Sequence, residues 1–383
     1  MFSPALRFAV YYAAFYLVLG MYLPYFPAWL EGRGLTPEWI GILVASGLLG
    51  RTLVAPLGAR WADTANRRRD PILILATLSL LLFIIHLPVF SPWILAVLAF
   101  LLGGAYFGQI PLADTFALRT ATRLGFPFGP VRAFGSLFFI LANFGAGAAL
   151  GALGAEWILT LIIAGSILLV LTSWTLPRGR RRRRGRVEDA QLTKVGRLLR
   201  GPFLWALLAS GLIQSSHGFY YAMSVLAWTA DGLPSVTIGA LWATGVAAEI
   251  LFLFCSGLPF LRRLSPGVLL MMGGAGGIVR WGLTALSPPL GVLFLLQALH
   301  AMTFAATFLG FMRYAAQEVP DDQAATAQAM NSALAGGGIT GLVSAVSGLL
   351  YDGMGTAGYM VMIVPCFVGL LAGLRLRLLR SKP

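Results

Sequence analysis

Residues 28–53, AWLEGRGLTPEWIGILVASGLLGRTL, return in altered form at residues 227–251, AWTADGLPSVTIGALWATGVAAEIL. At one constant offset, Gly34 pairs with Gly232, Gly41 with Gly239, Gly47 with Gly245 and Arg51 with Glu249. A second match aligns Arg119-Thr120-Ala121 with Arg313-Tyr314-Ala315. The chain is therefore built from two parallel repeats, and its fold has to be a duplicated one.

The sequence around these repeats is far more apolar than a soluble core requires. Of 383 residues, 58% are hydrophobic and 11% are charged, whereas charged residues make up about a quarter of an average soluble domain. A bilayer has to supply the missing apolar surroundings. The composition thus excludes the ordinary soluble enzymes and binding modules.

Apolar runs of about 20 residues predict twelve membrane-spanning helices in two groups of six. The first group covers 8–30, 40–60, 71–90, 93–118, 132–154 and 157–176, and the second covers 203–229, 236–258, 267–287, 290–314, 323–350 and 356–375. We therefore predict an all-α integral membrane protein with two pseudo-symmetric six-helix bundles. The N-terminal bundle occupies 1–176, a basic cytoplasmic linker 177–202, and the C-terminal bundle 203–383.

The formal charge of +14 lies almost entirely in alternate loops and in the linker. Basic residues collect on the cytoplasmic side of membrane proteins, so this alternation predicts that both termini are cytoplasmic. It also argues against a nucleic-acid-binding face, which needs basic residues gathered on a folded surface. Cys255 and Cys366 lie in apolar spans without metal-ligand spacing, so we expect no disulfide, metal or cofactor.

Short motifs spread over nearly the whole chain carry a family resemblance. They are LPYF at 23–26, GLTPEWIG at 34–41, PLAD at 111–114, VRAFGS at 131–136, SHGFYY at 216–221, VRWG at 279–282, LH at 299–300 and MRY at 312–314. The chain resembles the major facilitator superfamily and, within it, the phenylpropionate and nucleoside proton symporter branch. The resemblance implies secondary transport by alternating access and no enzymatic activity.

Ionisable residues inside the predicted spans are the first site candidates, because a charge at the bilayer centre needs a partner or a wet cavity. Glu249 is the candidate proton carrier, since burial favours its neutral form and a nearby cation its charged form. A permanent structural ion pair is the alternative. Arg51 could bind a substrate carboxylate with two parallel donors, or simply neutralise Glu249.

Two histidines lie on polar stripes of their predicted helices. His217 shares a helical face with Gln214, Tyr221 and Ser224, which indicates a substrate ligand or a second proton site. His300 is a further substrate contact by the same reasoning. A satisfied interhelical hydrogen bond is the plainer alternative for both. Arg280 is also expected to contact substrate, because its VRWG context in the resembled family argues that it faces inward.

A cytoplasmic gate is expected from charged residues near the inner ends of the helices. Asp63 keeps the acidic position of the superfamily's loop signature, although Ala59 replaces its glycine. Asp114, Arg119 and Arg132 form a second candidate cluster, in which Asp114 would also take part in proton coupling. Snorkelling alone would explain the two arginines.

Aromatic and amide side chains complete the expected substrate site. Tyr25, Tyr220 and Trp242 are candidates for stacking on an aromatic substrate, and Gln109 and Tyr221 are added as polar contacts. Interfacial anchoring or packing is the alternative for the aromatic residues.

The expected activity is proton-coupled import of a small aromatic carboxylate, like 3-phenylpropionate, across the bacterial cytoplasmic membrane. The partners are substrate, protons and lipid, without nucleic acid, and the protein is expected to be a monomer. A nucleoside or sugar proton symporter, or a drug-efflux exchanger, would share the fold. An anion requires free guanidinium groups, whereas a neutral polyol requires amide, carboxylate and aromatic groups instead.

Overall fold

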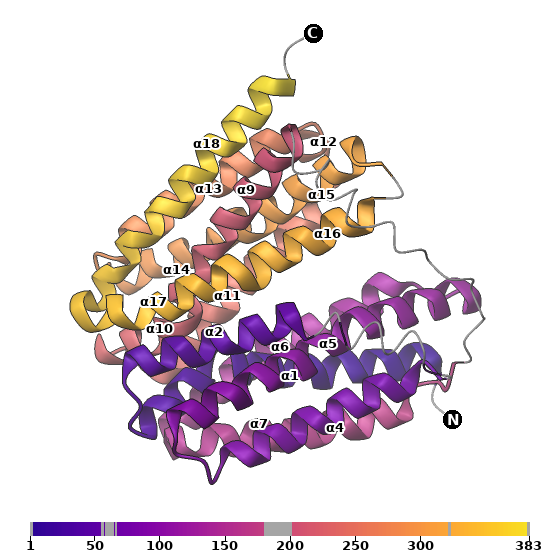
Figure 1. Ribbon diagram of the computed structural model, residues 1–383, viewed down its shortest axis with the longest axis vertical. Coiled ribbons are helices and arrows are strands. Elements are labelled where there is room, and N and C mark those ends of the chain that lie inside the picture. The colour runs from indigo at the N-terminus through magenta and orange to yellow at the C-terminus, as the bar shows by residue number, and fades with distance from the viewer. Residues whose placement is uncertain are drawn as a thin grey trace. The chain divides into compact units, whose positions relative to one another are not determined.

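The structure is a computed structural model that describes residues 3–54, 57, 65, 67–179, 201–320 and 323–380. Within these ranges the chain is almost entirely helical and forms no β-strand (Figure 1). Asp63, the predicted acidic residue of the gating loop, lies outside the described residues. The same is true of 180–200, which is most of the predicted linker.

The first half of the chain contains six long helices. They are α1 (Pro4–Gly32), α2 (Pro37–Leu53), α4 (Arg69–His86), α5 (Pro92–Leu124), α6 (Phe128–Leu153) and α7 (Ile158–Thr175), with the short 3₁₀ turn η1 (Ala155–Trp157) before α7. α1 packs against α6 and α7, and α5 packs against α2 and α4.

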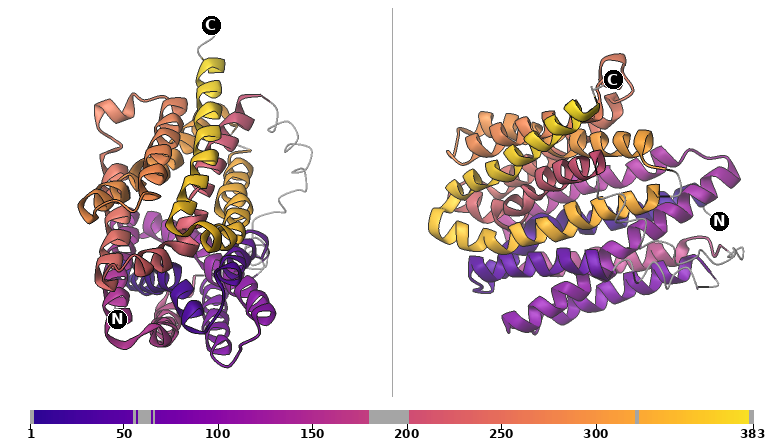
Figure 2. Two further views of the ribbon diagram at one scale, coloured as in Figure 1. Left: turned by 90° about the vertical axis from the view of Figure 1, so that its left-hand side faces the viewer. Right: turned by 45° about the horizontal axis from the view of Figure 1, so that its top comes forward.

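The second half also crosses six times, but four of its crossings are assembled from shorter helical pieces. Its elements are α9 (Pro202–Ser215), α10 (His217–Ala230), α11 (Ser235–Cys255), α12 (Pro259–Arg262), α13 (Pro266–Thr284), α14 (Leu290–Ala298), the π-helix η2 (Ala301–Ala306), α15 (Thr307–Glu318), α16 (Ala324–Ala333), the π-helix η3 (Leu334–Gly338), α17 (Ile339–Met354), the 3₁₀-helix η4 (Gly355–Met362) and α18 (Ile363–Arg380). α18 runs alongside α13 and α9 (Figure 2).

Hydropathy explains why length and composition alone find fewer spans than the fold has. Among the described residues, 8 helical stretches are long and apolar enough to cross a membrane, and one of these, Thr326–Leu379, contains two crossings. The remaining three crossings fail this test for identifiable reasons. α2 has 17 residues, the α9–α10 crossing is interrupted at Ser216, and α13 is diluted by glycines and Arg280. Each of the twelve predicted spans coincides with a helix or a run of helical pieces among the described residues, so the all-helical prediction is confirmed.

Proline and glycine set many helix boundaries. Proline occupies the first turn of α1, α2, α5, α9 and α13, where its missing N–H costs nothing. Ser3 and Ser265 cap α1 and α13 by accepting from Leu6 N and Val268 N. Gly125 ends α5 with φ at 75°, a left-handed conformation that favours glycine.

The described residues divide into two compact units. The first contains the described part of 1–184 together with 222–243, and the second contains the rest of the described chain. Within the first unit, α2 and α5 cross very closely. A Cβ on Gly103 would lie 1.9 Å from the carbonyl oxygen of Gly47, so only glycine permits this approach.

Candidate functional site

A fully buried arginine organises a polar cluster in the second unit. Arg280 on α13 has no exposed surface. Its Nη1 lies 3.2 Å from His217 Nε2, 3.0 Å from His300 Nδ1 and 3.0 Å from Thr303 Oγ1. Its Nη2 donates to Gln297 Oε1 at 2.8 Å. A buried cation needs polar partners, and these four acceptors supply them.

Glycines on α13 allow its neighbours to approach closely enough to surround Arg280. A Cβ on Gly273 would lie 2.0 Å from Thr307 Oγ1, and one on Gly277 would lie 2.3 Å from Cys366 Sγ. The first glycine faces the α14–α15 crossing and the second faces α18. Arg280 follows Gly277 by one helical turn, so close packing on both sides delivers the guanidinium between helices.

Irregular backbone places the histidines. The α9–α10 crossing is broken at Ser216, whose Oγ accepts from Trp281 Nε1 at 2.8 Å, and His217 follows directly. On the neighbouring crossing, the π turn η2 begins after His300, and Thr307 Oγ1 donates to Met302 O at 3.3 Å. Such local breaks and π turns recur at functional sites in helices.

The hydrogen bonds define the tautomer of each histidine. His217 Nδ1 lies 2.9 Å from the Gln214 carbonyl oxygen; because a carbonyl only accepts, Nδ1 carries the hydrogen and Nε2 is the acceptor. Arg280 can only donate, so His300 Nδ1 is an acceptor and its Nε2 carries the hydrogen. That Nε2 lies 3.5 Å from Glu249 Oε2. Arg280 is therefore connected to Glu249 through a neutral His300.

One guanidinium nitrogen faces more acceptors than it can serve. Nη1 has two hydrogens, but His217 Nε2, His300 Nδ1 and Thr303 Oγ1 all lie within hydrogen-bond distance of it. Thr303 Oγ1 also lies 3.1 Å from His217 Nε2 and can donate to it. Protonation of one histidine would therefore redistribute the bonds rather than only remove one.

The first unit contains a second charged cluster, formed by α1, α5 and α6. Asp114 Oδ1 accepts from Tyr12 Oη at 2.7 Å and from Arg132 Nε at 3.0 Å. Arg132 Nη2 also donates to the Tyr16 hydroxyl. The guanidinium carbon lies 5.2 Å and 4.6 Å from the ring centroids of Tyr12 and Tyr16. The two predicted gate residues are thus in contact, whereas Arg119 is exposed.

Gln109 lies in a buried hydrogen-bond chain of the same unit. Its Oε1 accepts from Tyr11 Oη at 3.4 Å, and its Nε2 donates to Ser79 Oγ at 3.3 Å. Both the oxygen and the nitrogen of the Gln109 amide are therefore already hydrogen-bonded within the unit.

The remaining predicted contacts are distributed over both units. Tyr220 and Tyr221 border the Arg280 cluster, with the guanidinium carbon 5.1 Å from the Tyr220 ring centroid and the Tyr221 ring 5.7 Å from His217. Arg51 lies half-buried with its guanidinium carbon 5.0 Å from the Phe107 ring centroid.

Two predicted stacking residues have their polar atoms occupied. Tyr25 is fully buried and donates to Asn143 O at 2.9 Å. Trp242 Nε1 donates to Ser224 Oγ at 3.2 Å. In this conformation both side chains hold helices together.

Sequence reasoning places Gln297 and Thr303 near the face of His300 but does not count them, or Tyr12 and Tyr16, among the site residues. Gln297 and Thr303 flank His300 at spacings of three residues, and this Q-x-x-H-x-x-T pattern on one helical face was the available signal. Tyr12 and Tyr16, which both contact Arg132, are four residues apart on one face of α1. Among the described residues, no three histidine, cysteine or acidic side chains gather to hold a metal.

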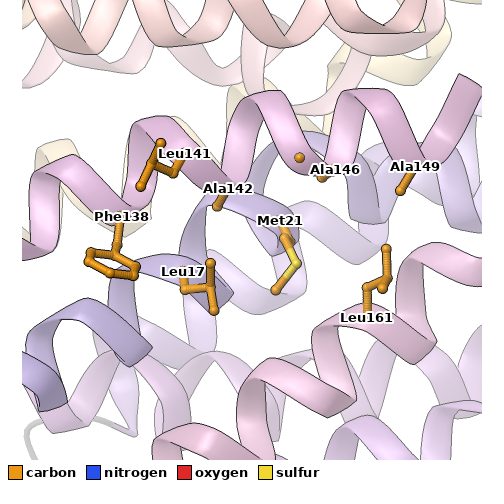
Figure 3. Close-up of a pocket in the computed structure, with 9 residues that line it drawn as sticks. Leu17, Met21, Phe138, Leu141, Ala142, Ala146, Ala149 and Leu161 are labelled. Carbon is orange, nitrogen blue, oxygen red and sulfur yellow. The ribbon is translucent and has the colours of Figure 1, made fainter.

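An apolar groove on the first unit offers no polar side chain to orient a substrate. It lies among α1, α6 and α7 (Figure 3). Its lining consists of Leu17, Met21, Phe138, Leu141, Ala142, Gly145, Ala146, Ala149 and Leu161. Without a polar side chain in the lining, the groove can fix no polar substrate and is suited to lipid.

Comparison with known proteins agrees with this architecture. The model of the MFS_1 like family matches residues 5–361. A probable 3-phenylpropionic acid transporter of Escherichia coli (strain K12) is 31% identical over 92% of this chain and 93% of its own length. The maltose permease of Geobacillus stearothermophilus is 25% identical over 86% of this chain and 83% of its own length.

Solved structures show the same fold. The nucleoside transporter NupG superposes with a TM-score of 0.85 at 16% identity and covers all of both chains. A bacterial homolog of the human lysosomal transporter Spinster superposes with a TM-score of 0.73 at 15% identity, covering 100% of this chain and 98% of its own. These relatives are membrane transporters, not enzymes. The chain belongs to the MFS_1 like family and is a multi-pass secondary transporter with the major facilitator fold.

Proposed function

We propose that the protein imports a small aromatic carboxylate, similar to 3-phenylpropionate, together with protons. The observation that carries the proposal is the buried Arg280–His300–Glu249 connection, which links a permanent cation to a carboxylate through a neutral histidine. The name of the 31% identical relative supports the substrate class. Import follows from symport with a proton gradient directed inward.

Proton binding would change the hydrogen bonds between α13 and the α14–α15 crossing. If Glu249 takes the proton, His300 Nε2–H loses its charged acceptor. If His300 Nδ1 takes the proton, it meets an N–H of Arg280 and that bond cannot persist. Nη1 can then turn to His217 Nε2 and Thr303 Oγ1. Either step loosens one contact while Nη1 of Arg280 keeps two acceptors within reach.

The substrate site is proposed to draw on guanidinium and aromatic groups. A guanidinium matches the geometry of a carboxylate, and Arg51 and Arg280 supply two candidates. Tyr220 and Tyr221 lie beside Arg280 and present ring faces. Asp114 and Arg132 are proposed as the cytoplasmic gate, because an ion pair between α5 and α6 can open and close with those helices.

The same proposal includes the organisation of the whole chain. Residues 1–176 and 203–383 would form the two bundles, joined by the basic linker at 177–202. Both termini would be cytoplasmic, in the inner membrane of a bacterium, and the protein would act as a monomer.

Proton uptake into sealed vesicles tests the proposal. Purified protein is reconstituted with an internal pH dye, and 3-phenylpropionate, uridine or maltose is added in turn. Acidification with 3-phenylpropionate alone is the expected result. Acidification with uridine or maltose instead would establish a nucleoside or sugar symporter, for which the maltose permease relative is the supporting observation. If vesicles preloaded with a drug release it when the outside solution is acidified, the protein would be a drug-efflux exchanger.

Glu249→Gln separates proton coupling from substrate movement. The amide keeps the shape of Glu249 but cannot bind the proton, so substrate-driven acidification is expected to disappear while exchange of preloaded substrate continues. Loss of both activities would assign Glu249 a structural role. Glu156→Gln, the same change at an exposed glutamate on η1, is the matched control and should leave both activities unchanged.

A further inference from the structure

Three buried polar groups around Arg280 have no hydrogen-bond partner. They are Arg280 Nε, Gln297 Nε2 and Thr284 Oγ1. Their side chains are fully buried, with exposed fractions of 0% for Arg280 and Gln297 and 1% for Thr284. Unpartnered buried polar atoms are uncommon in folded proteins, and each requires an explanation.

Two of the three side chains are joined by a hydrogen bond, and the third lies one helical turn from Arg280. Gln297 accepts from Arg280 Nη2 through Oε1, so its Nε2 is held beside the guanidinium. Thr284 follows Arg280 by four residues on α13 and projects from the same helical face. All three groups can donate a hydrogen, and two of them can do nothing else. Such a set selects a ligand that accepts hydrogen bonds.

The positive charge of Arg280 also favours a ligand that is an anion. Among the residues that the structure describes, no carboxylate lies within ion-pair distance of Arg280, since Glu249 is reached only through His300. The two histidines are neutral in the tautomers defined above. A buried cation without a counter-charge is strongly disfavoured, and an anion would supply both the charge and the missing acceptors.

We propose that Arg280 Nε, Gln297 Nε2 and Thr284 Oγ1 form a binding site for a small monovalent anion. Two sources supply this chemistry: the carboxylate of the transported substrate, or a resident halide. Only the first source rests on the proposed function. The site differs from the proton path because it uses the side of the guanidinium that faces neither histidine.

The test measures anion binding by the whole purified protein, not transport. Its unfolding temperature is followed in sulfate buffer of constant ionic strength while chloride, bromide or 3-phenylpropionate is titrated. A ligand that binds only the folded state raises this temperature along a saturation curve. We expect such a curve for at least one of the three anions.

Variants assign the binding to these residues. Gln297→Leu and Thr284→Val each remove one hydrogen-bonding group. Each is expected to weaken the affinity for the anion at least tenfold. Gln297→Glu places a carboxylate beside Arg280 and is expected to raise the unfolding temperature without added anion and to abolish the titration. Ser347→Ala removes a fully buried hydroxyl elsewhere in the same unit and should leave the curve unchanged.

The outcomes separate this inference from the proposed function. Saturation by halide without competition from 3-phenylpropionate identifies a resident ion. Saturation by 3-phenylpropionate, displaced by halide, identifies the substrate carboxylate. No saturable effect of any of the three, or an unaltered curve in Gln297→Leu, overturns the site. Failure of 3-phenylpropionate transport with intact halide binding would contradict the proposed function alone.

Discussion

At the scale of single residues, the shape of the Arg280 side chain matters as much as its charge. One guanidinium donates to Gln297 on one nitrogen and to histidine and threonine acceptors on another. A lysine ammonium carries the same charge but is a compact point on a flexible stem. It cannot span both sets of acceptors.

Arg280→Lys is therefore expected to lower proton-coupled uptake by roughly 10-fold to 100-fold, the loss that corresponds to one charged hydrogen bond of about 1.5–3 kcal/mol. The measurement is kcat/KM for uptake into vesicles. Arg377→Lys, an exposed arginine of the same unit, is the control. Uptake at the wild-type level in Arg280→Lys would show that charge alone suffices and would remove the hydrogen-bond network from the mechanism.

The residue scale also shows what the sequence could indicate. Glu249, His217, His300 and Arg280 stand out because ionisable groups are rare inside apolar spans, and the structure brings all four into one connected cluster. Gln297 and Thr303 carry no charge, and single neutral polar residues are common in membrane helices. Their importance depends on which helix faces them, and that depends on tertiary packing.

At the scale of helices, the close packing of α13 is what gives the irregular crossings their shape. Hydropathy predicts where a span begins and ends within a few residues, but it treats a straight helix, a break at Ser216 and the π turn η2 alike. These irregularities follow from contacts between helices. Thr307 is an example, because its side chain donates to Met302 O in the π turn and also lies against Gly273.

Gly273→Ala is expected to destabilise the second unit by about 1–3 kcal/mol, the usual cost of overpacking. Its Cβ would lie 2.0 Å from Thr307 Oγ1 and 3.1 Å from the Met302 carbonyl oxygen. The readout is the unfolding temperature in detergent. Gly291→Ala, where a Cβ would meet nothing within 4 Å, is the matched control.

A double-mutant cycle then tests the contact itself. Thr307→Ala removes the nearest atom, so Gly273→Ala should cost less in that background than in the wild type. The rescue is expected to be partial, because the Met302 backbone stays. Strict additivity of the two changes would contradict the packing described for α13 and η2.

At the scale of the whole molecule, the distribution of charge in the loops predicts orientation. Exposed Arg123 and Arg262 lie at helix ends that the positive-inside rule assigns to the cytoplasm, whereas exposed Glu156 and Asp352 lie at the opposite helix ends. Single cysteines at these four positions, in a Cys255→Ser background, can be labelled with a membrane-impermeant thiol reagent. Cys366 is buried and should contribute little signal.

We expect Glu156→Cys and Asp352→Cys to be labelled in intact cells, and Arg123→Cys and Arg262→Cys only after permeabilisation. One crossing, α6, separates Arg123 from Glu156, whereas several crossings separate Glu156 from Arg262. Comparing Arg123→Cys with Glu156→Cys therefore tests α6 alone. Labelling of all four with the opposite pattern would reverse the orientation and leave the helix count intact. Labelling of Arg123→Cys and Glu156→Cys from the same side would mean that α6 does not cross the membrane, and the twelve-helix fold itself would be wrong.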